Sequence, residues 1–72
     1  MPVRLSGNEI VTTLANDGWE LARVSGSHHI MRHASGQQTS VPVHASRPLP
    51  AGTLGSIRRD AGRTASQLRD LL

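Results

Sequence analysis

Apolar residues near the start of the chain recur at the spacing of a helix. The stripe predicts a helix over residues 7–17, and Ser6 and Glu9 have the spacing of a capping box at its start. Gly18 follows, and glycine commonly ends a helix in the left-handed conformation. The apolar positions of this helix are Ile10, Val11, Leu14 and Ala15.

A second apolar stripe lies in the last third of the chain. It predicts a helix that starts at Pro50, where proline is well tolerated, and ends before Gly62. Thr64 and Gln67 repeat the capping-box spacing and predict a short terminal helix. Leu54, Ile57 and Ala61 form the first stripe of this region, and Leu68, Leu71 and Leu72 are expected to dock the terminal helix on the core.

Between these helices the pattern is that of extended chain. Residues 19–24, 28–33 and 39–44 are predicted strands, joined by a turn at 25–27 and a polar connector at 34–38. The order is α-β-β-β-α with a short C-terminal tail helix. The fold class is therefore α+β, with a three-stranded antiparallel sheet and helices on one face, in a single domain over residues 1–72.

A hairpin that turns about Gly36 fixes which residues face each other in the second and third strands. It places His28 opposite His44, Ile30 opposite Pro42 and Arg32 opposite Ser40, all on one exposed face. The other face carries Met31 against Val41 and His29 near Val43, and we expect the helices to cover it. Two imidazoles would then approach one phosphodiester from the exposed face.

Composition limits the chemistry of this short chain. It has no cysteine, which excludes disulfides and thiolate zinc sites and suits a reducing cytoplasm. No run approaches the roughly 20 apolar residues of a membrane span, so we expect a cytoplasmic protein with no membrane partner. All eight basic residues are arginine and the net charge is +3, which favours a polyanionic partner or, alternatively, an ordinary solvated surface.

Imidazole is the most evident catalytic group in the chain. The four histidines lie within the predicted second and third strands, and histidine transfers protons near neutral pH. On one strand, His29 and His33 would stand about 13 Å apart, too far to share a metal ion, so no metal or cofactor is expected. The alternative for each histidine is a structural or merely exposed side chain.

Several short motifs follow one another in order along the chain: Leu5-Ser6-Gly7, Gly18-Trp19, Gly26-Ser27-His28-His29, Val41-Pro42-Val43-His44, Gly52-Thr53-Leu54, Ile57 and Ala61-Gly62. This ordered set resembles the HicA-type toxins of bacterial toxin-antitoxin modules, also described as YcfA-like mRNA interferases. The resemblance covers almost the whole chain. Three places depart from the pattern of the family. Asn8 stands where lysine is frequent, Trp19 stands where phenylalanine is usual, and Pro50-Ala51 stands where Lys-Pro is common.

This resemblance implies a double-stranded-RNA-binding-like fold and metal-independent cleavage of mRNA. It also implies a HicB-type antitoxin as protein partner, with the toxin monomeric alone and oligomeric only through the antitoxin. The catalytic histidine of the family corresponds to His28. We expect His28 to act as general acid or base, because RNA cleavage through the 2′-hydroxyl needs one proton removed and one supplied.

The remaining candidate residues have supporting or binding roles. Gly26, Ser27 and His44 are the candidates for catalytic support, although Gly26 and Ser27 also suit a simple tight turn. The candidate RNA-binding residues are Arg23, His29, Arg32, Arg58 and Arg59. The alternatives to an RNA-cleaving enzyme are a non-catalytic RNA-binding module and an interaction subunit that meets only its antitoxin.

Overall fold

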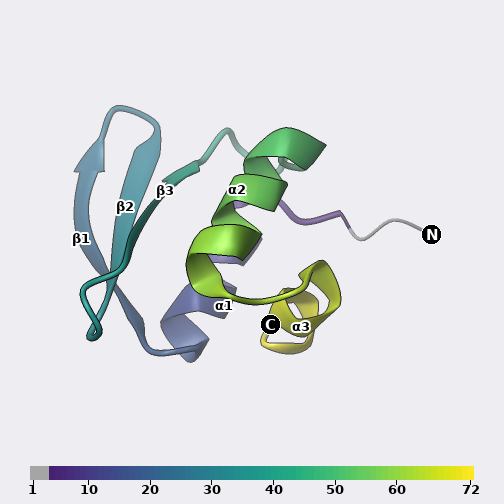
Figure 1. Ribbon diagram of the computed structural model, residues 1–72. Helices are drawn as coiled ribbons and strands as arrows, with labels where there is room; N and C mark the ends of the chain where they lie inside the picture. The colour runs from purple at the N-terminus through teal and green to yellow at the C-terminus, as the bar shows by residue number, and fades with distance from the viewer. Residues whose placement is uncertain (1–3) are drawn as a thin grey trace.

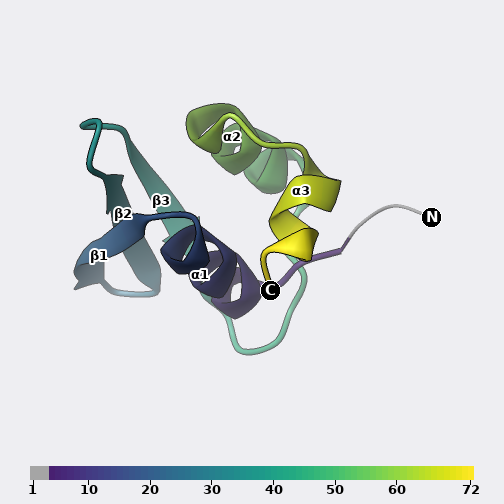
Figure 2. The same cartoon turned by 90° about the horizontal axis from the view of Figure 1, so that it is seen from below.

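The computed structural model describes residues 4–72 and confirms the expected order of elements (Figure 1). Residues 1–3, part of the single expected domain, lie outside this range. An antiparallel sheet in the order β1-β2-β3 has α1 and α2 on one face, as Figure 2 also shows. The elements are α1 (Gly7–Asn16), β1 (Trp19–Ser25), β2 (His28–His33), β3 (Gln38–Pro42), α2 (Ala51–Ala61) and α3 (Ala65–Asp70).

Both predicted capping boxes are present. The Ser6 hydroxyl accepts a hydrogen bond from the Glu9 amide at 3.2 Å, and the Ser6 amide donates to the Glu9 carboxylate at 2.9 Å. Thr64 and Gln67 make the same reciprocal pair at the start of α3. These bonds satisfy backbone donors that no helical carbonyl can reach, so the helix starts are fixed by local sequence.

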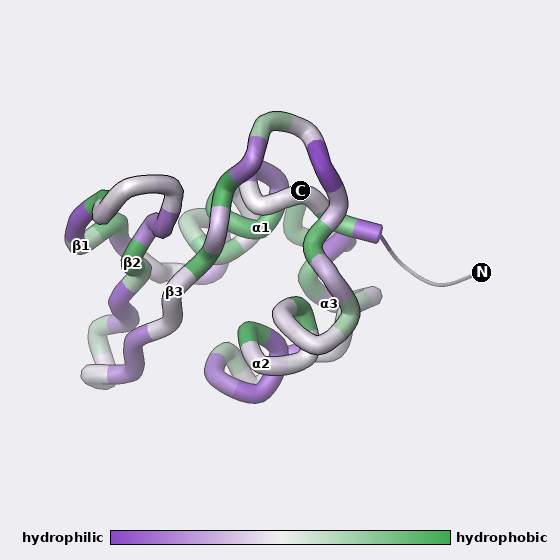
Figure 3. Tube along the Cα trace, turned by 90° about the horizontal axis from the view of Figure 1, so that it is seen from above, coloured by the Kyte–Doolittle hydropathy of each residue, from purple (hydrophilic) through white to green (hydrophobic). Residues whose placement is uncertain are grey.

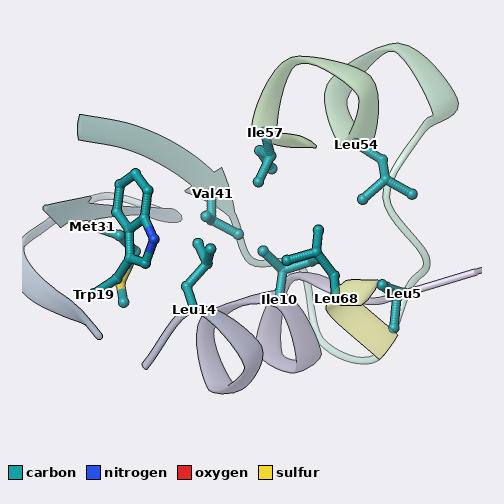
Figure 4. Close-up of a cluster of buried hydrophobic side chains, with 9 residues drawn as sticks. All are labelled: Leu5, Ile10, Leu14, Trp19, Met31, Val41, Leu54, Ile57 and Leu68. Carbon is teal, nitrogen blue, oxygen red and sulfur yellow. The ribbon is translucent and has the colours of Figure 1, made fainter. Parts of the chain in front are cut away.

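The hydrophobic core lies between the helices and the sheet. The tube in Figure 3 shows hydrophobic positions interspersed with hydrophilic ones along each element, and Figure 4 shows the buried side chains meeting in one cluster. Of the three C-terminal leucines expected to dock, Leu68 is fully buried but Leu72 is exposed, so the prediction was wrong for Leu72. The core residues are Leu5, Ile10, Leu14, Trp19, Met31, Val41, Leu54, Ile57 and Leu68.

Two polar contacts join the helices to neighbouring elements. The hydroxyl of buried Thr39 donates to the Asp60 carboxylate at 2.9 Å, which ties β3 to α2. Arg63 donates to both carboxylate oxygens of Asp17 at 3.0 and 2.8 Å, and this hydrogen-bonded pairing raises the pKa of Arg63. The second contact links the end of α1 to the segment before α3.

The start of α1 packs against the backbone at the end of β3. A Cβ atom added to Gly7 would collide with the carbonyl oxygen of Pro42 and lie 2.9 Å from the Cα of Val43. Only a residue without a side chain permits this approach. The helix therefore supports from behind the part of β3 that pairs with the start of β2.

The register of β2 and β3 differs from the predicted one by two residues. His28 pairs with Pro42, Ile30 with Ser40, and Arg32 with Gln38. The turn closes one residue earlier than expected, because the His33 amide bonds to the Gln37 carbonyl and the Gly36 amide bonds to the His33 carbonyl. A shift of two keeps every side chain on its expected face and changes only its partners. On the helix side, Met31 accordingly pairs with Thr39, and His29 with Val41.

The third strand is also shorter than the predicted range of 39–44. It ends at Pro42, and the chain then turns through Ala45, which has a φ of 53°. His44 lies beyond the strand, so its predicted position opposite His28 was wrong.

Candidate active site

His28 lies at the first position of β2, the central strand, and is exposed. The sheet face that carries it is called the outer face below, because the side chains of the opposite face, such as Met31 and Val41, are buried against the helices. Residues at alternate positions of β2 and their paired partners share this face. They are Glu20, Arg23, Ser25, His28, Ile30, Arg32, Gln38, Ser40 and Pro42.

The turn before His28 is held in place on both sides. Gly26 has a φ of 59°, in the left-handed region that glycine adopts without strain. The carbonyl of Ser27 accepts a hydrogen bond from the Val43 amide at 2.7 Å, which ties the turn to the chain after β3. The expected turn role of Gly26 and Ser27 is therefore present, and it presets the position of His28.

The direct neighbours of His28 on the outer face are Ser25 and Pro42. Ser25 pairs with His28 across the two-residue turn, and Pro42 pairs with it from β3. The sequence reasoning missed Ser25. A two-residue turn at 26–27 places the residues on either side of it opposite each other, and this signal was available in the sequence.

A β-bulge in β1 brings Arg23 to the outer face. Leu21 pairs with Met31, but the next regular pair is Arg23 with Ile30, so Ala22 is an extra residue in the strand. Without the bulge, simple alternation would put Arg23 on the same face as Leu21, toward the helices. Arg23 instead lies diagonally across from His28, at a typical separation of about 7–8 Å between Cα atoms.

Arg32 shares the outer face but lies farther from His28. Four residues along a strand correspond to about 13 Å. Arg32 stands between Glu20 and Gln38, and its guanidinium donates to the Gln38 side chain at 3.2 Å. Of the two arginines expected to hold a phosphate at His28, Arg23 is the nearer one.

The other candidates lie away from the outer face. His29 points to the helix side, where its Nδ1 is buried and has no hydrogen-bond partner among residues 4–72. Arg58 and Arg59 are on α2, Arg58 in a hollow with Arg4, and Arg59 hydrogen-bonded to Ser56. The structure therefore does not bring these three together with His28.

His33 occupies the other end of β2 and has a structural environment. Its ring centroid lies 5.4 Å from that of Trp19, and its Nδ1 is 2.8 Å from the Ser35 hydroxyl. Within residues 4–72, no three histidine or acidic side chains are grouped so that they could hold a metal ion. The outer face thus offers one exposed imidazole, a nearby guanidinium and hydroxyl groups, which is a set suited to proton transfer beside a phosphate.

The fold and this face together define a small α+β protein with helices on one side of the sheet and a polar, histidine-bearing face on the other. A family model described as "HicA toxin of bacterial toxin-antitoxin" matches residues 7–62, and the chain belongs to this family. It is a toxin of the toxin-antitoxin class. A search among curated proteins finds no match. In the part of the chain that the structure describes, no helix is long and apolar enough to cross a bilayer.

Proposed function

We propose that the protein is a metal-independent endoribonuclease that cleaves mRNA in the cytoplasm, with His28 as the catalytic residue. The proposal rests on the position of His28, which is exposed on the central strand of a sheet face that none of the helices within residues 4–72 covers. An RNA strand can reach the imidazole there without any rearrangement of the fold.

Cleavage proceeds through the ribose next to the scissile phosphate. The 2′-oxygen attacks phosphorus and forms a new P–O bond, while the bond from phosphorus to O5′ breaks and its electron pair goes to O5′. One proton leaves the 2′-hydroxyl and one is added to O5′. His28 carries out one of these transfers and water the other, which leaves a 2′,3′-cyclic phosphate and a 5′-hydroxyl end.

Arg23 is placed to stabilise the phosphate during this step. Negative charge accumulates on the non-bridging oxygens, and a guanidinium offers them two parallel donors. The Arg23 side chain is long enough to span the diagonal distance to a phosphate held at His28. The bulge at Ala22 therefore serves the proposed function, because it turns Arg23 toward the His28 imidazole.

The partner in this proposal is a HicB-type antitoxin. A protein that covers the outer face excludes RNA from His28 without changing the toxin itself. The toxin is a monomer alone, and oligomers arise through the antitoxin.

Expression of the chain in bacteria is expected to arrest growth, because free toxin degrades mRNA. The His28→Ala variant should permit growth at the same level of protein, and co-expression of a HicB-type antitoxin should restore growth of cells with the unchanged toxin. The measurement is the growth rate after induction, with protein levels followed by immunoblot. Equal arrest by both toxins, or no arrest by either, would contradict the proposal.

A further inference from the structure

A groove lies at the end of the sheet where the Val43 amide bonds to the Ser27 carbonyl, and its lining runs from Pro42 to Thr53. Figure 1 shows the β1–β2 turn and the segment between β3 and α2 at this same end of the sheet. Its volume is about 380 Å³, which is in the range of small-ligand pockets. Pro42 forms one wall and is also the residue paired with His28. The groove therefore begins one strand away from the imidazole, about 4.8 Å in a sheet.

Two side chains in the lining of this groove donate hydrogen bonds through nitrogen. They are the Arg47 guanidinium and the His44 imidazole, which offers a ring N–H, and no carboxylate from residues 4–72 lines the groove. The ion pairs among residues 4–72 involve Arg63 and Arg69, so Arg47 is not neutralised by them. An anion entering the groove meets the Arg47 guanidinium, whose forked donors suit a phosphate.

Apart from Thr53, the rest of the lining is apolar and largely made of proline rings. The apolar lining residues are Pro42, Pro48, Leu49 and Pro50. A nucleotide combines an anionic phosphate with a flat base that gains free energy when it leaves water. This mixed lining matches a nucleotide better than it matches an inorganic anion, which needs no apolar wall.

The segment that carries these residues is fixed by backbone contacts. The Leu49 amide bonds to the Leu5 carbonyl at 2.8 Å, and the Arg47 amide bonds to the His44 carbonyl at 3.2 Å. The side-chain amide of Asn8 donates a hydrogen bond to the Ala45 carbonyl at 3.4 Å. Ala45 has a positive φ, which non-glycine residues adopt only where the surrounding structure holds them. A groove ordered in advance loses little conformational entropy when a ligand binds.

We infer that this groove binds the nucleotide adjacent to the one cleaved at His28, in the same RNA strand. The inference rests on the proposed function for the place of the cut, and it adds a substrate contact outside the outer face. Arg47 holds the phosphate of this neighbouring nucleotide, with His44 as a second donor. In this assignment His44 binds substrate and does not exchange protons at the cut.

The test is the affinity of a fluorescently labelled single-stranded RNA that carries 2′-O-methyl groups and so has no 2′-hydroxyl to attack phosphorus, measured by anisotropy over a range of salt on the His28→Ala protein. In the His28→Ala protein, the further substitution Arg47→Gln should weaken RNA binding about tenfold, as expected for the loss of a charged hydrogen bond. The slope of log affinity against log salt should fall by about 0.7, the value for one phosphate contact in a single strand. The control adds Arg69→Gln, which removes an equal charge from exposed α3 and should change affinity by less than about twofold.

Equal losses in the two double variants, or no RNA binding by the His28→Ala protein, would overturn the inference. Thermal melting checks that each variant is folded, and Arg47 is exposed in a loop, so its replacement removes no core contact. Because the RNA is not cut in this assay, its result does not depend on whether His28 is catalytic. Failure of the proposed function would appear separately, as uncut RNA or unimpaired growth with the unchanged protein.

Discussion

Replacing Gly7 with alanine is expected to destabilise the protein by about 3 kcal/mol, which is the upper part of the range for overpacking. The added Cβ would collide with the backbone of Pro42 and Val43, and backbone cannot rotate away as the end of a flexible side chain can. For a domain of this size, the loss should lower the Tm by more than about 10 °C. Circular dichroism during thermal unfolding measures it.

Gly52→Ala is the matched control, because Gly52 also lies in the first turn of a helix. A Cβ atom added there meets no atom within 4 Å. Alanine has the better helix propensity, so this variant should be as stable as the original protein or up to about 1 kcal/mol more stable. If the Gly7→Ala and Gly52→Ala proteins have the same Tm, α1 and β3 do not pack as closely as described.

His28→Ala should reduce the rate of RNA cleavage by about 10²- to 10⁴-fold, the usual contribution of a positioned acid or base. The side chain is exposed, so its removal costs little stability and the loss reports on chemistry. The single-turnover rate at saturating protein measures the effect on the chemical step. A loss of the same size in RNA affinity is not expected, because the variant keeps the arginines that we propose to contact phosphate.

His33→Gln is the control for this variant. It also removes an imidazole from β2, but from the opposite sheet face, where the ring packs on Trp19. Its cleavage rate should stay within about threefold of the original while the protein is folded, because it has no part in the proton transfers. If the two variants lose the same activity, the role assigned to His28 is wrong.

The sequence predicted the elements well wherever local chemistry decides them. Both capping boxes formed as expected, and the bounds of β2 were correct. The faces of β2 were also predicted correctly, because hydrophobic alternation fixes which side of a strand is buried. His28 was therefore expected on the exposed face, where the structure places it.

The sequence could not determine the exact geometry of the turn between β2 and β3, or the features set by contacts between distant segments. Turn geometry chose a register in which Pro42, not His44, is the partner of His28. The bulge that turns Arg23 outward depends on how β1 pairs with β2, and single-strand alternation carries no sign of it. The groove around Arg47 needs the segment before α2 to be folded back against Leu5, which no local pattern indicates.

The chemical ends of the RNA fragments distinguish attack by the 2′-oxygen, with His28 as acid or base, from hydrolysis by water. Purified protein is incubated with a single-stranded RNA in EDTA, and the products are analysed by mass spectrometry beside those of the His28→Ala variant. If His28 promotes attack by the 2′-oxygen, the unchanged protein should yield fragments with a 2′,3′-cyclic phosphate and a 5′-hydroxyl, and the variant should leave the RNA intact. Fragments with a 5′-phosphate, or the same fragments at the same rate from the variant, would contradict it.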